Sequence, residues 1–283
     1  MKKIVTLVVV LLLISSVCFG AQDERPAGRL TKLGISEETL NAVLAGKVLP
    51  QLPFAGFKYF DTMNSMLAAL RSGRIAALHA DECTADYLLS RTKDYAKFRP
   101  AGFIGTNLSF SMLLREEDGE LCARISSAIK DMKADGTLDS LKKKYIDDCI
   151  AGTDPAAVKP EHFDGAAVWK VALTGDRPPM DYVSNAGEPI GFNTALVSEI
   201  AKRLKVNAEF ISIDTGARAT ALASKSCDAV FWMETGQFQA PDGSRVHDNV
   251  DKEDMPERTI ITEAFLESPL VYVTLANSPL LQQ

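Results

Sequence analysis

The sequence predicts an α/β fold with parallel-dominated sheets, and three observations support this class. Two stretches of the chain alternate short apolar segments with amphipathic helices, the pattern of strands covered by helices. A spacer at 147–165, with two prolines and two glycines, separates the two stretches. The chain has 283 residues, 46% of them hydrophobic, which is enough for about two units with their own cores.

The N-terminus has the features of a cleaved signal peptide at 1–20. Two lysines precede an apolar run from Ile4 to Ile14, and small residues follow at Cys18 and Gly20. The run is short for a membrane span, which takes about 20 apolar residues. We therefore expect cleavage after Gly20 and a periplasmic or cell-surface location. Lipidation at Cys18 is the less favoured alternative, because bulky Val17 precedes it.

The first stretch contains strands and helices at regular intervals. A helix is predicted at 62–72, where Met63, Met66 and Leu70 recur at helical spacing, with Asp61 as its cap and Gly73 at its end. The other elements predicted by the same criteria are a helix at 37–44 capped by Ser36, strands at 57–60, 75–79 and 108–114, and helices at 84–91, 119–133 and 137–145.

The second stretch repeats the alternation. Its clearest element is an amphipathic helix at 194–204, and a turn at 177–179 follows the first strand. The other predicted elements are strands at 169–173, 208–213, 227–232 and 270–275 and a helix at 216–224, with a polar excursion at 237–254.

Charge and cysteine usage limit the partners. There are 31 Lys and Arg against 37 Asp and Glu, and an acidic chain without a basic tract is poorly suited to nucleic acid. Three histidines and the lack of a CxxC pair make a zinc site unexpected. Cys122 opens one predicted helix and Cys149 closes the next, so antiparallel packing of the two would allow a disulfide. The four cysteines of the mature chain permit three pairings, and the sequence does not choose between them.

From Lys170 onwards the residues resemble the polar amino-acid family (family 3) of periplasmic solute-binding proteins. The run KVALTGDRPPMDYVSNAGEPIGFNTALVSEIAKRL is similar to the family's opening strand, PPF-like turn, GF element and helix. ALASKSCDAVFWMET and MPERTIITEAFLESPLVYVT resemble its later segments. The resemblance covers about 169–276 apart from the excursion. It implies a type II periplasmic-binding fold, with two lobes, a hinge and a cleft that closes on a solute.

The first stretch resembles the other half of the same family. DTMNSMLAALRSGRIAALHADECTADYLL looks like its second-lobe unit, and LSFSMLLREEDGELCARISSAIKDMKADGTLDSLKKKYI like its closing segment. In the family these parts follow the first lobe, whereas here they precede it. The resemblance therefore implies one circularly permuted protein; the alternative is the tail of one domain followed by the head of another. The predicted units are 26–110 (second-lobe-like), 111–146 (return strand and closing helices), 147–165 (linker) and 166–283 (first-lobe-like).

The resemblance also implies which residues contact a solute. In the family an arginine typically holds the ligand's carboxylate and a second-lobe aspartate its ammonium group. By motif these roles fall on Arg258 and Asp81, and Thr235 matches the family's threonine. Each charged residue has a structural alternative: Arg258 as a surface arginine beside Glu257, and Asp81 as a helix cap.

The chain departs from the family where aromatic rings normally stand, at Arg177, Met180 and Thr215. Trp232 and Glu234 occupy positions where small residues usually line the cleft. Trp232 either stacks on the solute or belongs to the core, and Arg177 either pairs with Glu234 or takes the carboxylate. The candidate ligand-binding residues are Asp81, Thr174, Asp176, Arg177, Thr215, Trp232, Glu234, Thr235 and Arg258.

These features predict an exported monomer that captures an amino acid or a similar small polar or acidic solute for the permease of an ABC-type importer. The prediction includes no catalysis and no cofactor. One alternative is a sensory or degenerate binding module, favoured by the missing aromatic pair. Another is an exported dehydratase-like enzyme on the same fold, in which Glu234 beside Arg177 would supply acid and base.

Overall fold

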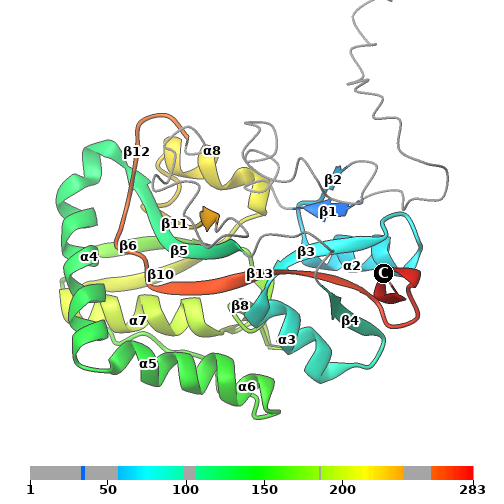
Figure 1. The fold of residues 1–283 in the computed structure, drawn as a ribbon. Helices are drawn as coiled ribbons and strands as arrows, with labels where there is room; N and C mark the ends of the chain where they lie inside the picture. The colour runs from blue at the N-terminus through cyan, green and yellow to red at the C-terminus, as the bar shows by residue number, and fades with distance from the viewer. Residues whose placement is uncertain (1–32, 36–56, 99–105, 185, 239–255, 283) are drawn as a thin grey trace, which may run out of the picture.

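Separate hydrophobic cores lie along one long sheet in the computed structural model (Figure 1). The structure describes residues 33–35, 57–98, 106–184, 186–238 and 256–282. The sheet has the order β10-β6-β11-β5-β13-β3-β1-β2, with β12 on β5 and β4 on β13. Its strands are β1 (Leu33–Ile35), β2 (Phe57–Tyr59), β3 (Ala77–Asp81), β4 (Tyr95–Phe98), β5 (Thr106–Arg115), β6 (Val168–Leu173), β10 (Asn207–Ser212), β11 (Ala229–Phe238), β12 (Thr259–Ile261) and β13 (Leu266–Leu275).

Strands β5 and β13 join the two halves of this sheet. The first part of β13, from Leu266 to Pro269, pairs with β5, and its remaining residues pair with β3 and β4. The outer strands pair in parallel, whereas β5 and β13 run antiparallel to their neighbours. The predicted α/β class is therefore confirmed, with a mixed sheet. The division into units at 26–110, 111–146, 147–165 and 166–283 stays a prediction.

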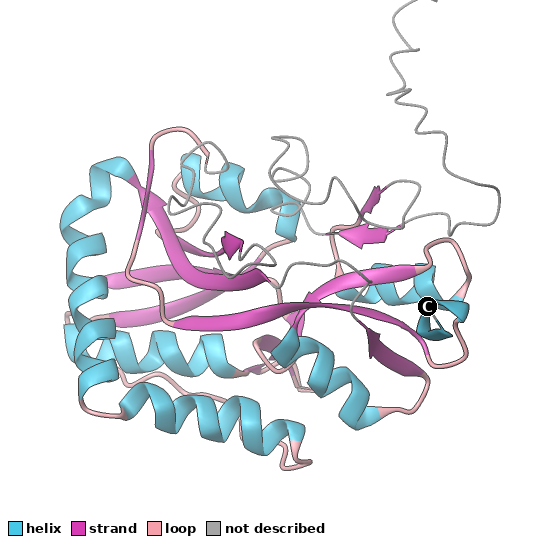
Figure 2. Ribbon diagram, in the orientation of Figure 1, coloured by secondary structure: helices cyan, strands magenta, loops and turns pink. Residues whose placement is uncertain are grey.

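The larger lobe is built on β10, β6, β11 and β5, with helices on both faces (Figure 2). Adjacent strand residues point to opposite faces, so Val171 and Phe231 pack toward α7 while Ala172 and Trp232 pack toward α8. Its helices are α4 (Gly119–Ala134), α5 (Thr137–Lys142), a π-helical turn (Lys143–Asp147), α6 (Asp148–Ile150), α7 (Phe192–Leu204) and α8 (Arg218–Ala223), with 3-10 turns at Glu116–Asp118 and Thr215–Ala217.

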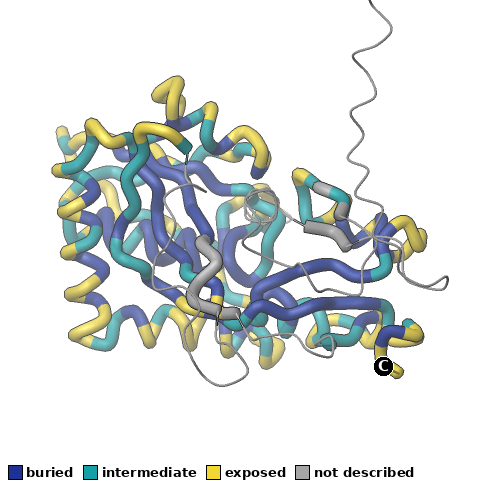
Figure 3. Tube along the Cα trace, turned by 45° about the horizontal axis from the view of Figure 1, so that its top comes forward, coloured by how far each residue is buried: buried dark blue, intermediate teal, exposed yellow. Residues whose placement is uncertain are grey.

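The smaller lobe combines elements from both ends of the described chain. Strands β1 to β4 and the second part of β13 form its sheet, covered by α2 (Met63–Arg71) and α3 (Glu82–Arg91). A 3-10 turn (Pro279–Gln282) ends the described chain beside it (Figure 1). Figure 3 shows the strands of both lobes buried and the helices exposed on their outer faces.

The predicted helix at 62–72 is present, with a different cap. The Thr62 hydroxyl, not Asp61, accepts the Ser65 N–H at 3.1 Å, so the helix begins one residue later than expected. Gly73 ends it with a φ of +70°, a conformation that favours glycine. The other predicted strands and helices are present with shifted ends, except that the helix at 37–44 lies outside the described residues.

Several short strands were not predicted. They are β1, β4, β12 and a separate three-stranded sheet, here called the flap, made of β7 (Asp176–Arg177), β8 (Asp181–Val183) and β9 (Pro189–Ile190). Strands of two to four residues are too short to show a period-two pattern. The flap matters most, because it carries two of the candidate ligand-binding residues.

The Cys122–Cys149 disulfide, which antiparallel packing of the two helices would have allowed, is not formed. All four described cysteines are free thiols. The Cys122 thiol donates to the Ile261 carbonyl at 3.4 Å, whereas Cys149 lies 3.8 Å from the Tyr182 hydroxyl. Helix α4 and the α5–α6 segment diverge from their common corner instead of packing antiparallel (Figure 1), which separates the two thiols.

The segment after α6 runs along the larger lobe without regular structure, whereas the first residues of the predicted linker at 147–165 belong to the π-helical turn and α6. The Asn207 side chain holds it by accepting the Phe163 N–H and donating to the Phe163 and Ala166 carbonyls. Arg91 on α3 donates to Asp154 of this segment at 2.5 Å, so the linker also contacts the smaller lobe.

The predicted leader at 1–20 lies outside the described residues. Within the part of the chain that the structure describes, no helix has the length and apolar character needed to cross a membrane.

The thiol arrangement gives the first testable prediction. We expect the reduced and non-reduced mature protein to melt at the same temperature, Cys122, Cys149 and Cys227 to react with a thiol reagent only after unfolding, and Cys83 to react slowly in the folded protein. In the folded protein Cys122, Cys149 and Cys227 are buried, and burial raises the pKa of half-buried Cys83 to about 11, which keeps its reactive thiolate scarce. A lower melting temperature under reductant would contradict this assignment.

Candidate functional site

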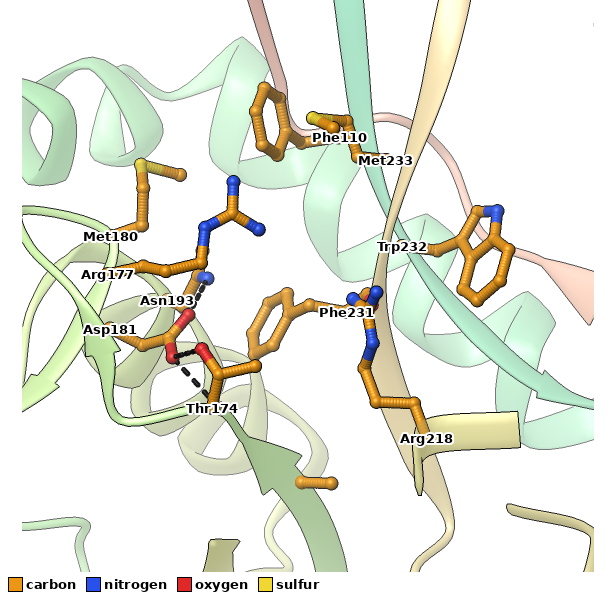
Figure 4. Close-up of a pocket in the computed structure, with 11 residues that line it drawn as sticks. Phe110, Thr174, Arg177, Met180, Asp181, Asn193, Arg218, Phe231, Trp232 and Met233 are labelled. Carbon is orange, nitrogen blue, oxygen red and sulfur yellow. Dashed lines mark hydrogen bonds between the residues drawn. The ribbon is translucent and has the colours of Figure 1, made fainter. Parts of the chain in front are cut away.

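A small cavity lies in the larger lobe where the flap meets the end of β6 and the first half of β11 (Figure 4). Its volume is about 20 Å³, room for roughly one water molecule. The lining residues are Phe110, Ala172, Thr174, Arg177, Met180, Asp181, Asn193, Arg218, Phe231, Trp232 and Met233. A solute of several heavy atoms therefore fits only when the lining side chains or the lobes move apart.

The wall of the cavity is anchored by Asp181, a buried residue that the sequence analysis did not select. Its carboxylate accepts hydrogen bonds from the Thr174 N–H (3.0 Å), the Thr174 hydroxyl (2.7 Å), the Gly175 N–H (2.9 Å) and the Asn193 side-chain amide (2.7 Å). Figure 4 shows the bonds to Thr174 and Asn193. One charge thus ties together the end of β6, the flap and the start of α7.

The start of α7 requires glycine at Gly191. Its φ is +114°, and a Cβ there would lie 2.5 Å from the Met180 carbonyl oxygen. The following Phe192 and Asn193 N–H groups donate to the Pro179 and Met180 carbonyls, which brings the turn onto the helix. The GF element is therefore needed for the close approach of flap and helix.

Arg177 reaches from the flap to the smaller lobe. It lies opposite Asp181 in the β7–β8 pair. Its Nη2 is 3.4 Å from Oδ2 of Asp81, and the side chains are 18% and 0% exposed. Asp81 also caps α3 by accepting the Thr84 N–H and hydroxyl, both at 2.8 Å. The helix-cap interpretation of Asp81 is thus confirmed, and the same carboxylate faces the flap.

Asp176, the neighbour of Arg177, also contacts the smaller lobe. Its Oδ2 accepts the N–H of Met63, the first residue of α2, at 2.7 Å. Burial raises the pKa of Asp176, and the Met63 N–H and the Arg177 guanidinium oppose this shift. Three candidate residues, Asp81, Asp176 and Arg177, are therefore brought together where the lobes meet.

Arg218 supplies a second guanidinium that the sequence analysis missed. It is buried at the start of α8, where it donates to the Thr215 carbonyl (3.1 Å) and the Phe231 carbonyl (2.7 Å) and lies 5.3 Å from the Trp232 ring centroid. Figure 4 shows Arg177 and Arg218 on different sides of the cavity. The sequence did contain one signal for Arg218: it is an arginine at the first position of a helix whose other residues are small or apolar.

Asn193 was also missed, although it is 4% exposed and lines the cavity. Its amide nitrogen donates to Asp181, while its Oδ1 is buried with no hydrogen-bond partner among the described residues. A buried acceptor without a partner is unfavourable, so a solute donor at this point would be stabilised.

The remaining candidates divide into two groups. Thr174 and Trp232 line the cavity, and Trp232 also packs in the core under α8. Thr215 is buried beside the cavity, where its carbonyl holds Arg218. Of Glu234 and Thr235 the structure describes only the backbone, which pairs with Ser109 and Leu108 of β5.

Arg258 is not brought to the cavity. It is exposed, and its carbonyl accepts the Glu116 N–H at 2.9 Å. The next residue, Thr259, pairs with Arg115 at the far end of β5, five residues from Phe110 of the cavity lining. The described residues also contain no cluster of His, Cys, Asp and Glu side chains arranged to hold a metal ion.

Comparison with known proteins supports the resemblance noted in the sequence. Residues 169–235 match the model of bacterial extracellular solute-binding proteins, family 3. This segment runs from β6 to β11 and carries the flap, α7 and Arg218. No curated protein matches the sequence.

Solved structures give weaker similarities. The ligand-binding component of an ABC-type import system from Staphylococcus aureus, with zinc bound, has a TM-score of 0.41 at 11% identity, over 89% of this chain and 67% of that one. The periplasmic aliphatic sulphonate binding protein SsuA from Escherichia coli gives 0.37 at 11%, over 86% and 64%. The reduced OxyR regulatory domain from Pseudomonas aeruginosa gives 0.36 at 11%, over 89% and 91%. At these scores no conclusion about function follows.

The anchoring role of Asp181 gives the second prediction. Asp181→Ala leaves the Thr174 and Gly175 N–H groups and the Asn193 amide without their acceptor, so we expect it to lower the free energy of unfolding by about 2–4 kcal/mol. Urea denaturation followed by circular dichroism measures the change. Asp214→Ala, at an exposed aspartate without a side-chain cap bond, is the matched control and should stay within about 0.5 kcal/mol of wild type. Equal midpoints for Asp181→Ala and wild type would rule out the anchor.

Proposed function

We propose that the protein is an exported solute-binding protein that captures a small carboxylate-bearing solute, an amino acid or a similar polar molecule, for an ABC-type importer. The observation that carries the proposal is the approach of Arg177 on the larger lobe to Asp81 on the smaller lobe. A guanidinium suits a carboxylate and an aspartate suits an ammonium group, so the two side chains are matched to the two ends of an amino acid. The family match of residues 169–235 supports the same class.

Arg177 takes the carboxylate role in this proposal, in place of Arg258. Arg177 lines the cavity and is mostly shielded from water, which strengthens its hydrogen bonds to an anion. Arg218 adds positive charge to the lining, and the Asn193 Oδ1 offers an acceptor to a solute donor. The apolar part of a solute would lie among Phe110, Phe231 and neighbouring methionines, which replace the family's aromatic pair.

Capture would require the lobes to separate about β5 and β13. These strands link the halves of the sheet, and β13 passes from one half to the other without interruption. Binding would then shift the population toward the closed arrangement.

We further propose that the chain is a circular permutation of the family's order. The matched segment at 169–235 follows the smaller-lobe elements β2 to α3 instead of preceding them. Strand β13 returns to pair with β3, so the smaller lobe uses residues from both ends of the described chain. Chain ends that lie in one lobe are compatible with such reordering.

A sensory or degenerate binding module is the second candidate, and one observation favours it. Arg177 and Asp81, which would hold opposite ends of a solute, contact each other directly. A solute therefore has to compete with an internal partner for each of its charged ends.

A thermal-shift screen over amino acids and small carboxylic acids tests the proposal and is the third prediction. At 100 times Kd a solute stabilises the protein by about 2.7 kcal/mol, which raises the melting temperature by roughly 5–11 °C. We expect Arg177→Gln to abolish the shift, because the solute carboxylate loses its partner. Arg258→Gln is the matched control and should keep the shift. If none of the compounds shifts the melting temperature, the result favours the sensory or degenerate module. If only Arg258→Gln loses the shift, Arg258 and not Arg177 binds the carboxylate.

Export gives the fourth prediction. N-terminal sequencing of protein secreted from a bacterial host should begin at Ala21, because cleavage is expected after Gly20. Retention of Met1 on protein in the cytoplasm would contradict export.

A further inference from the structure

Two adjacent residues of the flap contact the smaller lobe at two different helices. The Asp176 carboxylate accepts the N–H of Met63 at the start of α2. Arg177 lies 3.4 Å from Asp81, which caps α3. Neighbouring residues of a strand point to opposite sides, so a two-residue strand can engage one helix on each side.

The arrangement of the smaller lobe explains why both helix starts face the flap. Strands β2 and β3 each pair in parallel with β1, and each is followed by its helix. The carboxyl ends of parallel strands lie at one edge of a sheet, and the N-termini of the following helices lie there too. Strand β7 is inserted at this edge.

The charges suit these positions. A helix N-terminus carries partial positive charge and unpaired N–H groups, which favour a carboxylate. In α2 the Thr62 hydroxyl accepts the Ser65 N–H and Asp176 accepts the Met63 N–H, so the cap is shared between the lobes. Asp81 is fully buried, and Arg177 supplies the opposite charge that such a carboxylate needs.

The flap is fixed to the rest of the larger lobe through Asp181. Arg177 lies opposite Asp181 in the β7–β8 pair, and Asp181 is fixed to Thr174, Gly175 and Asn193. Pulling Arg177 away from Asp81 therefore also pulls Asp176 away from Met63.

We propose that Asp176 and Arg177 form a latch that holds the two lobes together by direct contact with the starts of α2 and α3. The latch joins protein groups to protein groups, so it favours closure in the absence of any solute, and it does not depend on the proposed function. Opening requires both contacts to break together, because β7 carries both residues.

Cys83 provides a built-in reporter of opening. It lies on α3 two residues after Asp81, is half-buried, and packs against the core of the larger lobe. Separation of the lobes exposes its thiol. Cys122 and Cys227 are buried within the larger lobe, so they become reactive only when the protein unfolds.

The test compares alkylation rates of individual thiols by peptide mass spectrometry in Asp176→Asn, Arg177→Gln and wild type, at one pH and with no solute added. We expect Cys83 to react roughly tenfold faster in each variant, because each loses a bond to a charged group. Arg177→Lys, which keeps the charge, should react at an intermediate rate. Small-angle X-ray scattering should show a larger radius of gyration for the two variants with the faster rate.

Asp214→Asn is the matched control, because Asp214 is an exposed aspartate of the same lobe outside the flap. Cys83 rates in Asp176→Asn and Arg177→Gln equal to the control, with an unchanged radius of gyration, would overturn the latch. A variant in which Cys122 and Cys227 also react has unfolded. In that case the Cys83 rate of Arg177→Lys is compared with that of wild type. Because no solute is used, failure of the latch is distinguishable from failure of the solute screen.

Discussion

The buried carboxylate of Asp181 is the interaction on which the cleft depends. Four hydrogen bonds converge on it from the end of β6, the turn into the flap and the start of α7. Apolar residues of these segments, such as Leu173, Met180 and Phe192, are buried in the core of the larger lobe, and the carboxylate satisfies the polar groups that are buried beside them. Since Arg177 lies directly opposite Asp181 in the flap, the position of the guanidinium follows from this anchor. Arg177, which would touch a solute, is thus positioned by Asp181, whose carboxylate already accepts hydrogen bonds from protein groups.

Charges alternate along the contact between the lobes. Asp176 faces a helix start, Arg177 faces Asp81, and Asp81 in turn caps the next helix. Each charge has a protein partner, so a solute gains affinity only by the difference between its own bonds and those it replaces. A zwitterion can replace the Arg177–Asp81 contact at both ends, whereas a simple anion satisfies Arg177 and leaves Asp81 without its cation. In the proposed function, this asymmetry favours solutes that carry both charges.

Elements with strong periodicity could be predicted from the sequence. Helix α2 and strand β5 are close to their expected ranges because their apolar spacing spans several residues. Two residues of the candidate site could also be selected from the sequence. Asp81 matches the family motif, and Arg177 stands where the family normally has an aromatic ring. Asp181 and Arg218 were missed because most of their partners are main-chain groups, and contacts of this kind leave no motif in the sequence. The motif indicated Arg258, but the strand it precedes pairs with the end of β5 that points away from the cleft.

The order of the chain also determines how the site is assembled. Asp81 ends β3, and its register partner is Leu270 of β13, a strand from the far end of the described chain. Ser268 of β13 accepts the Glu82 N–H, which helps to fix the start of α3 beside Asp81. The position of Asp81 therefore depends on β13, a strand that pairs with β5 of the larger lobe before it reaches β3. Closing the loop between segments so distant in sequence costs conformational entropy, which the contacts along β13 must offset. Because the strand that sets Asp81 is also paired with the lobe that carries Arg177, the sheet itself brings the two charges to the same place.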